Sequence, residues 1–266
     1  MPTVRRPAVA GLFYPGSAGE LRSTVEALLD EAAPDAGPVP KAVIAPHAGY
    51  VYSGPTAAAA FRALAAGPGG HRLRRVVVLG PAHRVPVRGL ALPGADAFAT
   101  PLGEIPVDVE AAAAASRLPQ VSTFPEAHGP EHSLEVELPF LQALFPKVAV
   151  LPIVVGDADE DEVAEVLDLL WGGPETAIVV SSDLSHYLPY DVARRVDRET
   201  ADEILALEGP LHPRQACGAF PINGLLAAAR QRGLAPRLLD LRNSGDTAGD
   251  RGRVVGYGAF AFTEAA

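Results

Sequence analysis

The side chains best suited to chemistry follow three short apolar runs of the chain. His47 comes directly after AVIAP, His83 comes after VVVLGPA, and Asp183 and His186 close the run TAIVVSSDLSH. An imidazole titrates near neutral pH and is the commonest metal ligand in proteins, and a neighbouring carboxylate can orient it. These residue types predict either a metal site or acid–base catalysis.

Apolar runs of this length are typical of strands that are buried on both faces of an α/β sheet. In open sheets of this kind, the carboxyl ends of the strands form the ligand-binding crevice. A single histidine after a strand is more often an ordinary loop residue than a ligand. The same pattern at three strand ends is not explained by packing, so we expect His47, His83, Asp183 and His186 to converge at one edge of the sheet.

The single cysteine, Cys217, lies in QACGAFPINGLLAAAR, just ahead of a predicted helix. The positive end of a helix dipole favours a thiolate, the form of cysteine that binds metals and acts as a nucleophile. A lone cysteine is about as often a small buried apolar residue. The sequence leaves both interpretations open, and a single cysteine excludes an intrachain disulfide.

Three further side chains are candidates for contact with a substrate. Tyr50 and Tyr52 follow His47 closely, and His132 lies in the acidic context EHSLE. The two tyrosines are predicted to reach a substrate bound beside His47. His132 is predicted to contact the substrate or to support a ligand.

The remaining histidines give weaker signals. His128 and His132 are four residues apart, but a glycine and a proline lie between them, so the shared helical face of a zinc protease is absent. His71 and His212 are predicted to lie in solvated loops.

Strand and helix patterns alternate along most of the chain, which predicts an α/β fold with three layers, a central mostly parallel or mixed sheet between helices. The predicted helices follow Ser17 and cover residues 54–64, 108–117, 133–144, 159–171, 190–207 and 220–232. The predicted strands cover residues 41–45, 74–80, 148–156, 176–182, 237–242 and 254–262.

Local signals add three expectations. Ser17 and Glu20 have the spacing of a capping box at the start of the first helix. Residues 94–108 are rich in proline and glycine and are predicted to form loops and turns. Glu135 and Glu137 are expected to complement the positive end of the dipole of the helix at 133–144.

Composition excludes several classes of partner. The chain of 266 residues has a net charge of −10, and it has no long basic run, which argues against nucleic acid or an anionic membrane as partner. No apolar run approaches the ~20 residues of a membrane-spanning helix. We therefore expect a cytoplasmic protein, with one domain over residues 1–266.

Six motifs in order resemble those of the Memo-like family, which is called AmmeMemoRadiSam system protein B in bacteria. They cover nearly the whole chain and read APHAGYVYSGPTA, LGPAHR, EHSLEVELPFLQ, SSDLSHY, ACGAFPI and NSGDTAGDRGRVVGYGAFAF. The family is similar in fold to the class III extradiol dioxygenases, which use non-haem iron(II). The resemblance implies a single Memo-like domain with a class III extradiol dioxygenase-like fold and a mononuclear metal site, with Fe(2+) as the cofactor and copper or zinc as alternatives.

By this resemblance His47, His83 and Cys217 align with metal-binding positions, and His186 aligns with the catalytic histidine, with Asp183 beside it to orient it. The implied activity is redox or dioxygenase-like chemistry on a small substrate. The third ligand position departs from the dioxygenases, which use a carboxylate and leave coordination positions open. A thiolate is softer, so it favours Cu(I) or zinc, or alters the properties of bound iron.

Two other functions stay open. Cys217, His186 and Asp183 have the residue types of a nucleophile, a base and an orienting group in a cysteine-dependent or zinc-dependent hydrolase. Animal members of the family are described as adaptors for phosphotyrosine peptides, which would make this chain a non-catalytic peptide- or protein-binding module. Arg84 and Arg88 are the arginines near the motifs that would pair with a phosphate. The family name implies radical-SAM and AMMECR1-type proteins as partners.

Overall fold

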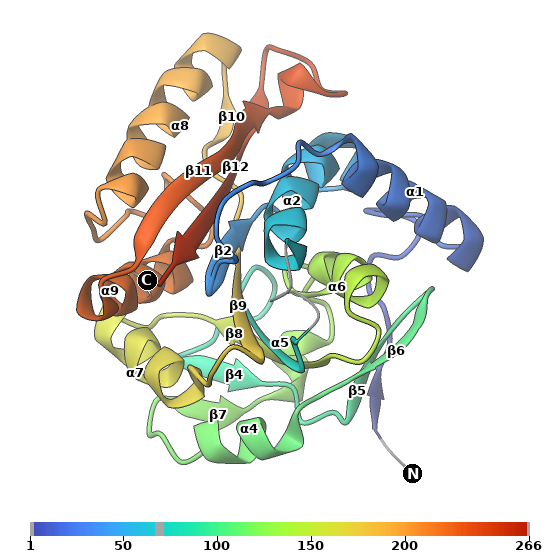
Figure 1. Ribbon diagram of the computed structural model, residues 1–266, viewed down its shortest axis with the longest axis vertical. Helices are drawn as coiled ribbons and strands as arrows, with labels where there is room; N and C mark the ends of the chain where they lie inside the picture. The colour runs from blue at the N-terminus through green and yellow to red at the C-terminus, as the bar shows by residue number, and fades with distance from the viewer. Residues whose placement is uncertain (1–2, 67–71, 265–266) are drawn as a thin grey trace.

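The computed structural model describes residues 3–66 and 72–264, and a large mixed sheet lies in it between layers of helices (Figure 1). The centre of the sheet is parallel and runs in the order β2 (Ala42–Ala45), β9 (Thr176–Ser181), β3 (Arg75–Pro81) and β8 (Ala149–Val155). The apolar side chains of these strands are buried, apart from the half-buried Ala149 at the start of β8. Both faces of the central strands are covered, which is why their sequences are continuously apolar.

Antiparallel pairings extend this centre on both sides. On one side β12 (Val254–Thr263) pairs with β2, while β11 (Ala235–Asn243) and β10 (His186–Leu188) both pair with β12. On the other side β4 (Leu90–Leu92) runs antiparallel to β8, and β7 (Val121–Thr123) runs parallel to β4. The expected α/β fold with a mixed sheet is confirmed.

Helices cover both faces of the sheet (Figure 1). One layer contains α1 (Ala18–Glu31), α2 (Tyr50–Ala65) and α6 (Leu138–Leu144). The other contains α4 (Val109–Ala115), α7 (Glu160–Leu170), α8 (Tyr190–Leu205) and α9 (Ala219–Arg232). None of the helices in the described residues has the length and apolar character needed to cross a bilayer.

The prediction of loops over residues 94–108 was wrong. This region forms a hairpin of β5 (Ala97–Thr100) and β6 (Gly103–Pro106), and β1 (Val4–Arg5) pairs with β5. Phe98 and Ile105 lie opposite each other in the hairpin and are buried, so they anchor it to the core. Gly103 follows the turn with a φ of 119°, a conformation that glycine adopts at low cost.

One predicted helix cap and one predicted helix start also differ. Ser17 occupies the N-cap of α1 but forms no side-chain capping hydrogen bond, so the predicted capping box with Glu20 is absent. Helix α2 begins at Tyr50 instead of residue 54, and Pro55 lies inside it. The Tyr50 N–H donates to the Phe13 carbonyl oxygen, which fixes the extra turn.

Residues 133–144 form a short 3-10 turn, η1 (Glu135–Glu137), followed by α6. Glu135 and Glu137 lie at this helical start as predicted, Glu137 as the N-cap of α6 without a side-chain capping hydrogen bond, and both are completely buried. His71 lies outside the described residues, and His212 is exposed as predicted.

Candidate metal centre

Three neighbouring strands of the parallel centre deliver side chains to one cleft. His47, Asp183 and His83 each follow a strand by two residues, after β2, β9 and β3 respectively. These residues, together with His132, His186 and Cys217, line a cleft of about 730 Å³. The carboxyl ends of adjacent parallel strands meet at one edge of a sheet, which explains why residues far apart in the sequence converge here.

Three histidines form the tightest part of the cleft. Each of His47, His83 and His132 offers a ring nitrogen, and these atoms lie within 4.8 Å of one another. The ring centroids of His83 and His132 are 4.7 Å apart, and that of His47 lies 5.1 Å from His83. Within residues 3–66 and 72–264, this is the one group of three or more such side chains close enough to share an ion.

The donor set fits a transition metal. Imidazole suits zinc, copper, iron and nickel, and metal–nitrogen bonds of ~2.0–2.1 Å place donors of one ion ~3–4 Å apart. Small side-chain rotations therefore suffice to bring the three nitrogens onto one ion. Burial lowers the pKa of His47 well below its usual value and that of His132 to about 4, so both rings are neutral at pH 7. The neutral ring is the form that binds a metal.

Glu131 holds His83 from behind. Its carboxylate accepts hydrogen bonds from His83 Nδ1 at 2.9 Å and from the His83 backbone N–H at 2.7 Å. It also accepts from the backbone N–H groups of His132 and Ser133. Burial alone would raise the pKa of Glu131, but these hydrogen bonds outweigh it and hold that pKa well below the usual range. His83 therefore donates from Nδ1 and keeps the Nε2 lone pair for a ligand, as in carboxylate–histidine–metal arrangements.

Cys217 lies beside His47, with Sγ 3.4 Å from His47 Nε2. It precedes α9, and its sulfur accepts a hydrogen bond from the Asp183 N–H at 3.3 Å. Burial, and then the Asp183 carboxyl, raise the pKa of the thiol. The helix end alone therefore does not produce the expected thiolate, whereas a bound cation would favour it.

His186 is oriented differently from the expectation. Its Nδ1 lies 2.8 Å from the Leu184 carbonyl oxygen, which can only accept, so the ring donates from Nδ1 and leaves Nε2 unprotonated. Asp183 instead accepts a hydrogen bond from the His47 backbone N–H at 2.8 Å. Burial raises the pKa of Asp183 to about 7. The Leu184 carbonyl, and not Asp183, orients His186, while Asp183 fixes the backbone at His47.

Comparison with known proteins identifies the family of this chain. The model of a family described as "Memo-like protein" matches residues 5–261. The chain belongs to the Memo-like family. A "MEMO1 family protein" of Archaeoglobus fulgidus is 36% identical to this Memo-like chain over 97% of it and 99% of the relative. One of Aquifex aeolicus is 36% identical over 96% of this chain and 97% of the relative.

A solved structure supports the fold alone. The uncharacterized protein JW3007 from Escherichia coli K12 is 12% identical to this Memo-like chain, with a TM-score of 0.50 over 98% of this chain and 100% of the other. The arrangement of sheet and helices is thus shared across very different sequences.

The predicted tyrosine contacts do not line the cleft of this Memo-like protein. Tyr50 is 4% exposed, and its hydroxyl donates to the Val136 carbonyl oxygen, so it belongs to the core. Tyr52 is 39% exposed but is not among the cleft-lining residues. Phe13, Tyr187 and Leu188 form the apolar walls instead.

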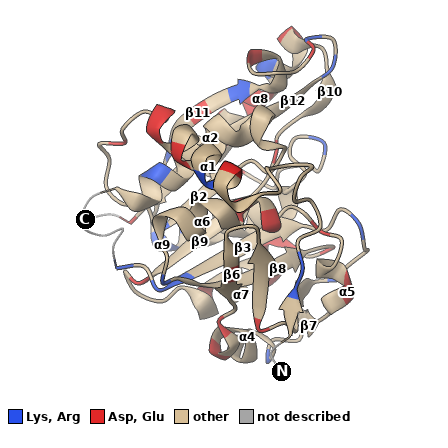
Figure 2. Ribbon diagram, turned by 90° about the vertical axis from the view of Figure 1, so that its right-hand side faces the viewer, with Lys and Arg blue, Asp and Glu red and all other residues tan. Residues whose placement is uncertain are grey.

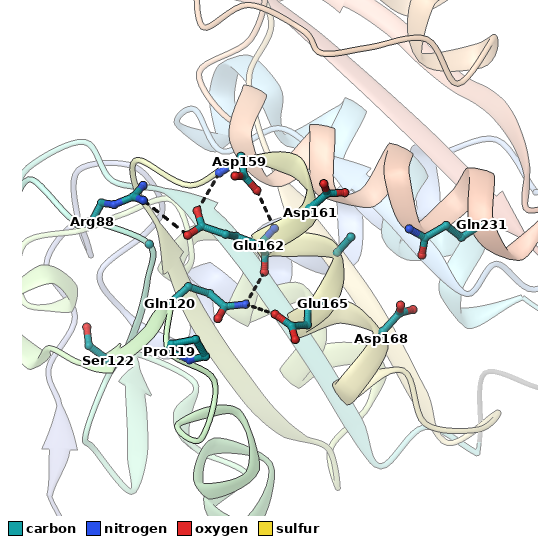
Figure 3. A pocket seen from close by; sticks show the side chains of 12 residues that line it. Arg88, Pro119, Gln120, Ser122, Asp159, Asp161, Glu162, Glu165, Asp168 and Gln231 are labelled. Carbon is teal, nitrogen blue, oxygen red and sulfur yellow. Dashed lines mark hydrogen bonds and ion pairs between the residues drawn. The ribbon is translucent and has the colours of Figure 1, made fainter.

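Arginines at the cleft also differ from the expected pair. Arg84 lines the cleft, as does Arg214 from the loop before Cys217. Arg88 lies in a separate groove of about 710 Å³, where it faces Glu162 (Figure 3). Five of the twelve residues that line that groove are acidic, and all five come from α7 or its N-cap, namely Asp159, Asp161, Glu162, Glu165 and Asp168.

The sequence interpretation missed the buried acids of the Memo-like motif EHSLEVE. Glu131 supports His83, Glu135 binds the N-terminal segment through Arg5 and Tyr14, and Glu137 contacts Ser181. A signal was present, since these acids alternate with residues such as Leu134, Val136 and Leu138, all of which are buried. Acids spaced within a buried apolar segment need internal partners, and this spacing predicts a polar network.

Proposed function

We propose that the cleft is a mononuclear metal centre, with non-haem iron(II) as the ion, which performs redox or dioxygenase-like chemistry on a small substrate. The observation that carries the proposal is the convergence of His47, His83 and His132, whose ring nitrogens lie within 4.8 Å of one another. Bound iron would supply the capacity to exchange electrons with the substrate. The resemblance to class III extradiol dioxygenases supports this choice of ion.

The proposed ligands are His47 and His83 with either His132 or Cys217 as the third. His132 belongs to the histidine cluster, while Cys217 lies beside His47 with its sulfur 3.4 Å from Nε2. A thiolate ligand would shift the preference toward copper or zinc, and a third imidazole keeps iron suitable. The two donor sets therefore predict different metals.

His186 is the proposed proton acceptor. Its donated hydrogen bond to Leu184 leaves Nε2 with a lone pair, and burial lowers the pKa of the ring, so it is neutral at pH 7. A neutral imidazole at the wall of the cleft can remove a proton from a substrate hydroxyl.

Anaerobic iron(II) titration of the purified protein tests the proposal. We expect one ion per chain, and His47→Ala or His83→Ala to weaken binding at least as much as the about 10–100-fold known for supporting residues. His132→Ala and Cys217→Ala distinguish the donor sets, because only the variant that loses the third ligand should lose affinity. Asp161→Asn, in the groove of Figure 3, is the control. Binding unchanged in all four site variants would contradict a metal centre here.

A second candidate function is a binding module for an anionic ligand, favoured by Arg84 and Arg214 at the cleft. Such a module would act within the AmmeMemoRadiSam system, with radical-SAM and AMMECR1-type proteins as proposed partners. It requires no bound metal, so titration with iron separates the two functions.

A further inference from the structure

A buried carboxyl group lies two hydrogen bonds behind the cleft. Glu137 is completely buried, and its Oε1 lies 2.8 Å from Ser181 Oγ, at the end of β9. The Ser181 hydroxyl in turn lies 2.7 Å from His47 Nδ1. Within the described residues, Glu137 Oε2 has no hydrogen-bond partner. The sequence Glu137, Ser181, His47 thus leads from the core to a proposed ligand.

The hydrogen atoms in this network can be counted. Ser181 Oγ has a third neighbour, the Ser133 carbonyl oxygen at 2.6 Å. A serine hydroxyl has one proton to donate and two lone pairs to accept with. The carbonyl oxygen only accepts, so it requires the hydroxyl proton. Glu137 and His47 must then both donate to Ser181 for every contact to be a hydrogen bond.

An ionised Glu137 is incompatible with hydrogen bonds in all three contacts of the Ser181 hydroxyl. A carboxylate only accepts, so Glu137 and the Ser133 carbonyl would compete for the one hydroxyl proton, and one oxygen pair would be in contact without a hydrogen. Donation from Ser181 to His47 instead would leave the Ser133 carbonyl without its proton. An ionised group would also leave Oε2 charged and unpartnered in the core, which is costly.

We infer that Glu137 is a neutral carboxylic acid that acts through Ser181 to hold the proton of His47 on Nδ1 and turn the Nε2 lone pair toward the cleft. Glu137 is therefore a positioning residue for His47. Burial raises the pKa of Glu137 well above its usual value, in agreement with this assignment. The consequence for metal binding rests on the proposed function, while the assignment of protons to Glu137 and His47 does not.

The two carboxyl groups that support the histidines thus differ in charge. Glu131 accepts hydrogen bonds from the side chain and backbone of His83 and from two further backbone N–H groups, so it must be ionised. Glu137 has no backbone donor among its described hydrogen bonds and donates its own proton. The same substitution should therefore have opposite outcomes at the two positions.

Matched variants test the inference. Glu137→Gln keeps a donor toward Ser181, so we expect its iron(II) affinity to stay within about threefold of the wild type. Glu131→Gln replaces an accepting oxygen by a donating amide, so we expect a loss of about 10–100-fold. Glu137→Leu removes the donor and should weaken binding about tenfold. An equal loss in Glu137→Gln and Glu131→Gln would overturn the inference.

Two measurements on metal-free protein test the protonation of Glu137 and the position of the His47 proton directly. Infrared spectra at pH 7 should show a protonated carboxyl band that Glu137→Gln loses, while Asp183→Asn identifies any contribution from Asp183. Nitrogen-15 NMR should show the His47 proton on Nδ1. A His47 proton on Nε2 would overturn the inference even if Glu137→Gln failed to fold, since it is observed in the wild type. If these signals are present but no iron binds, the proposed function fails and the inference stands.

Discussion

The cleft and the groove of Figure 3 have similar volumes, about 730 and 710 Å³, but they differ in the elements that supply their side chains and in the burial of those side chains. The cleft gathers its side chains from several strand ends, and its histidines are held by buried partners such as Glu131 and Ser181. All five acids that line the groove come from α7 or its N-cap, and Asp161 and Glu165 are exposed.

The acids of the groove serve the helix that carries them. Asp159 and Glu162 form a capping box at the start of α7, and Glu165 accepts a hydrogen bond from Gln120 (Figure 3). Acidic side chains in the first turn suit the helix dipole and remain solvated. A cluster of charged side chains therefore does not by itself indicate a functional site. Polar side chains that are buried and hydrogen-bonded to other buried groups are the better indicator. Figure 2 shows that acidic residues occur on many elements of the structure.

The largest expected difference between the two regions is in the free energy of unfolding when one acidic side chain from each is truncated to alanine. Glu135 is buried and binds Arg5, Tyr14 and the backbone N–H groups of Ala8 and Val9. Glu135→Ala leaves the Arg5 charge buried without its partner, so we expect a loss of ~3–5 kcal/mol in the free energy of unfolding. Urea unfolding followed by circular dichroism measures this loss.

Glu165→Ala, in the groove, is the matched control. Its side chain is exposed, so the same measurement should give a change within ~0.5 kcal/mol. Similar losses for Glu135→Ala and Glu165→Ala would remove the distinction between the two regions.

His128 is buried but lies outside the cleft, so its effect on stability can be measured without a contribution from a bound metal ion. Burial lowers the pKa of His128 to about 4 from an ordinary value of 6.5. Between pH 6.5 and 4 the unfolded chain binds a proton that the folded chain does not, so the free energy of unfolding falls as the pH is lowered through this range. The contribution of His128 is ~3 kcal/mol.

His128→Gln keeps a donor for the Ala91 carbonyl oxygen but does not titrate. Unfolding of metal-free protein between pH 7 and 4 should therefore show a shallower fall in this variant. Some fall should persist because His132 has a similarly lowered pKa. An unchanged slope in His128→Gln would show that His128 titrates normally.

The smallest effect concerns the arginines of the two regions. Arg214 lines the cleft and Arg88 faces the acids of the groove. We expect Arg214→Gln to weaken the binding of phenyl phosphate by at most about fivefold, because an exposed ion pair contributes ~0.2–1 kcal/mol. Arg88→Gln should leave the affinity unchanged. Calorimetric titration compares the two, and an equal effect would place the anion outside the cleft.

The fold was accessible from sequence because it depends on repeated local patterns. Continuous apolar runs marked β2, β3, β8 and β9, and parallel strands must end at a common edge. This rule alone grouped His47, His83 and Asp183. The hairpin of β5 and β6 was missed because the glycine and proline residues of this region were assigned to loops. The strands become evident only from the structure, where Phe98 and Ile105 pair across the hairpin and are both buried.

The supports of the candidate site were harder to predict. Whether Glu131 faces solvent or His83 depends on how the segment before η1 packs against β3, and no local pattern fixes that. The same limit applies to Tyr50, which looked accessible beside His47 but turns into the core when α2 begins early. His132 joins the cluster because its segment folds back over β3 and β9, through contacts such as that between Ser181 and Ser133.

The bond between Arg5 and Glu135 joins residues 130 positions apart, and Phe13, in the same N-terminal segment, packs against His132 with ring centroids 4.8 Å apart. During synthesis this segment is made before Glu135, so it cannot form these contacts until residue 135 has left the ribosome. Contacts between distant residues form slowly, and β9 and Cys217 arrive later still. A nascent chain that stops before β9 therefore contains Phe13 and His132 but lacks Asp183, His186 and Cys217, so its cleft is incomplete.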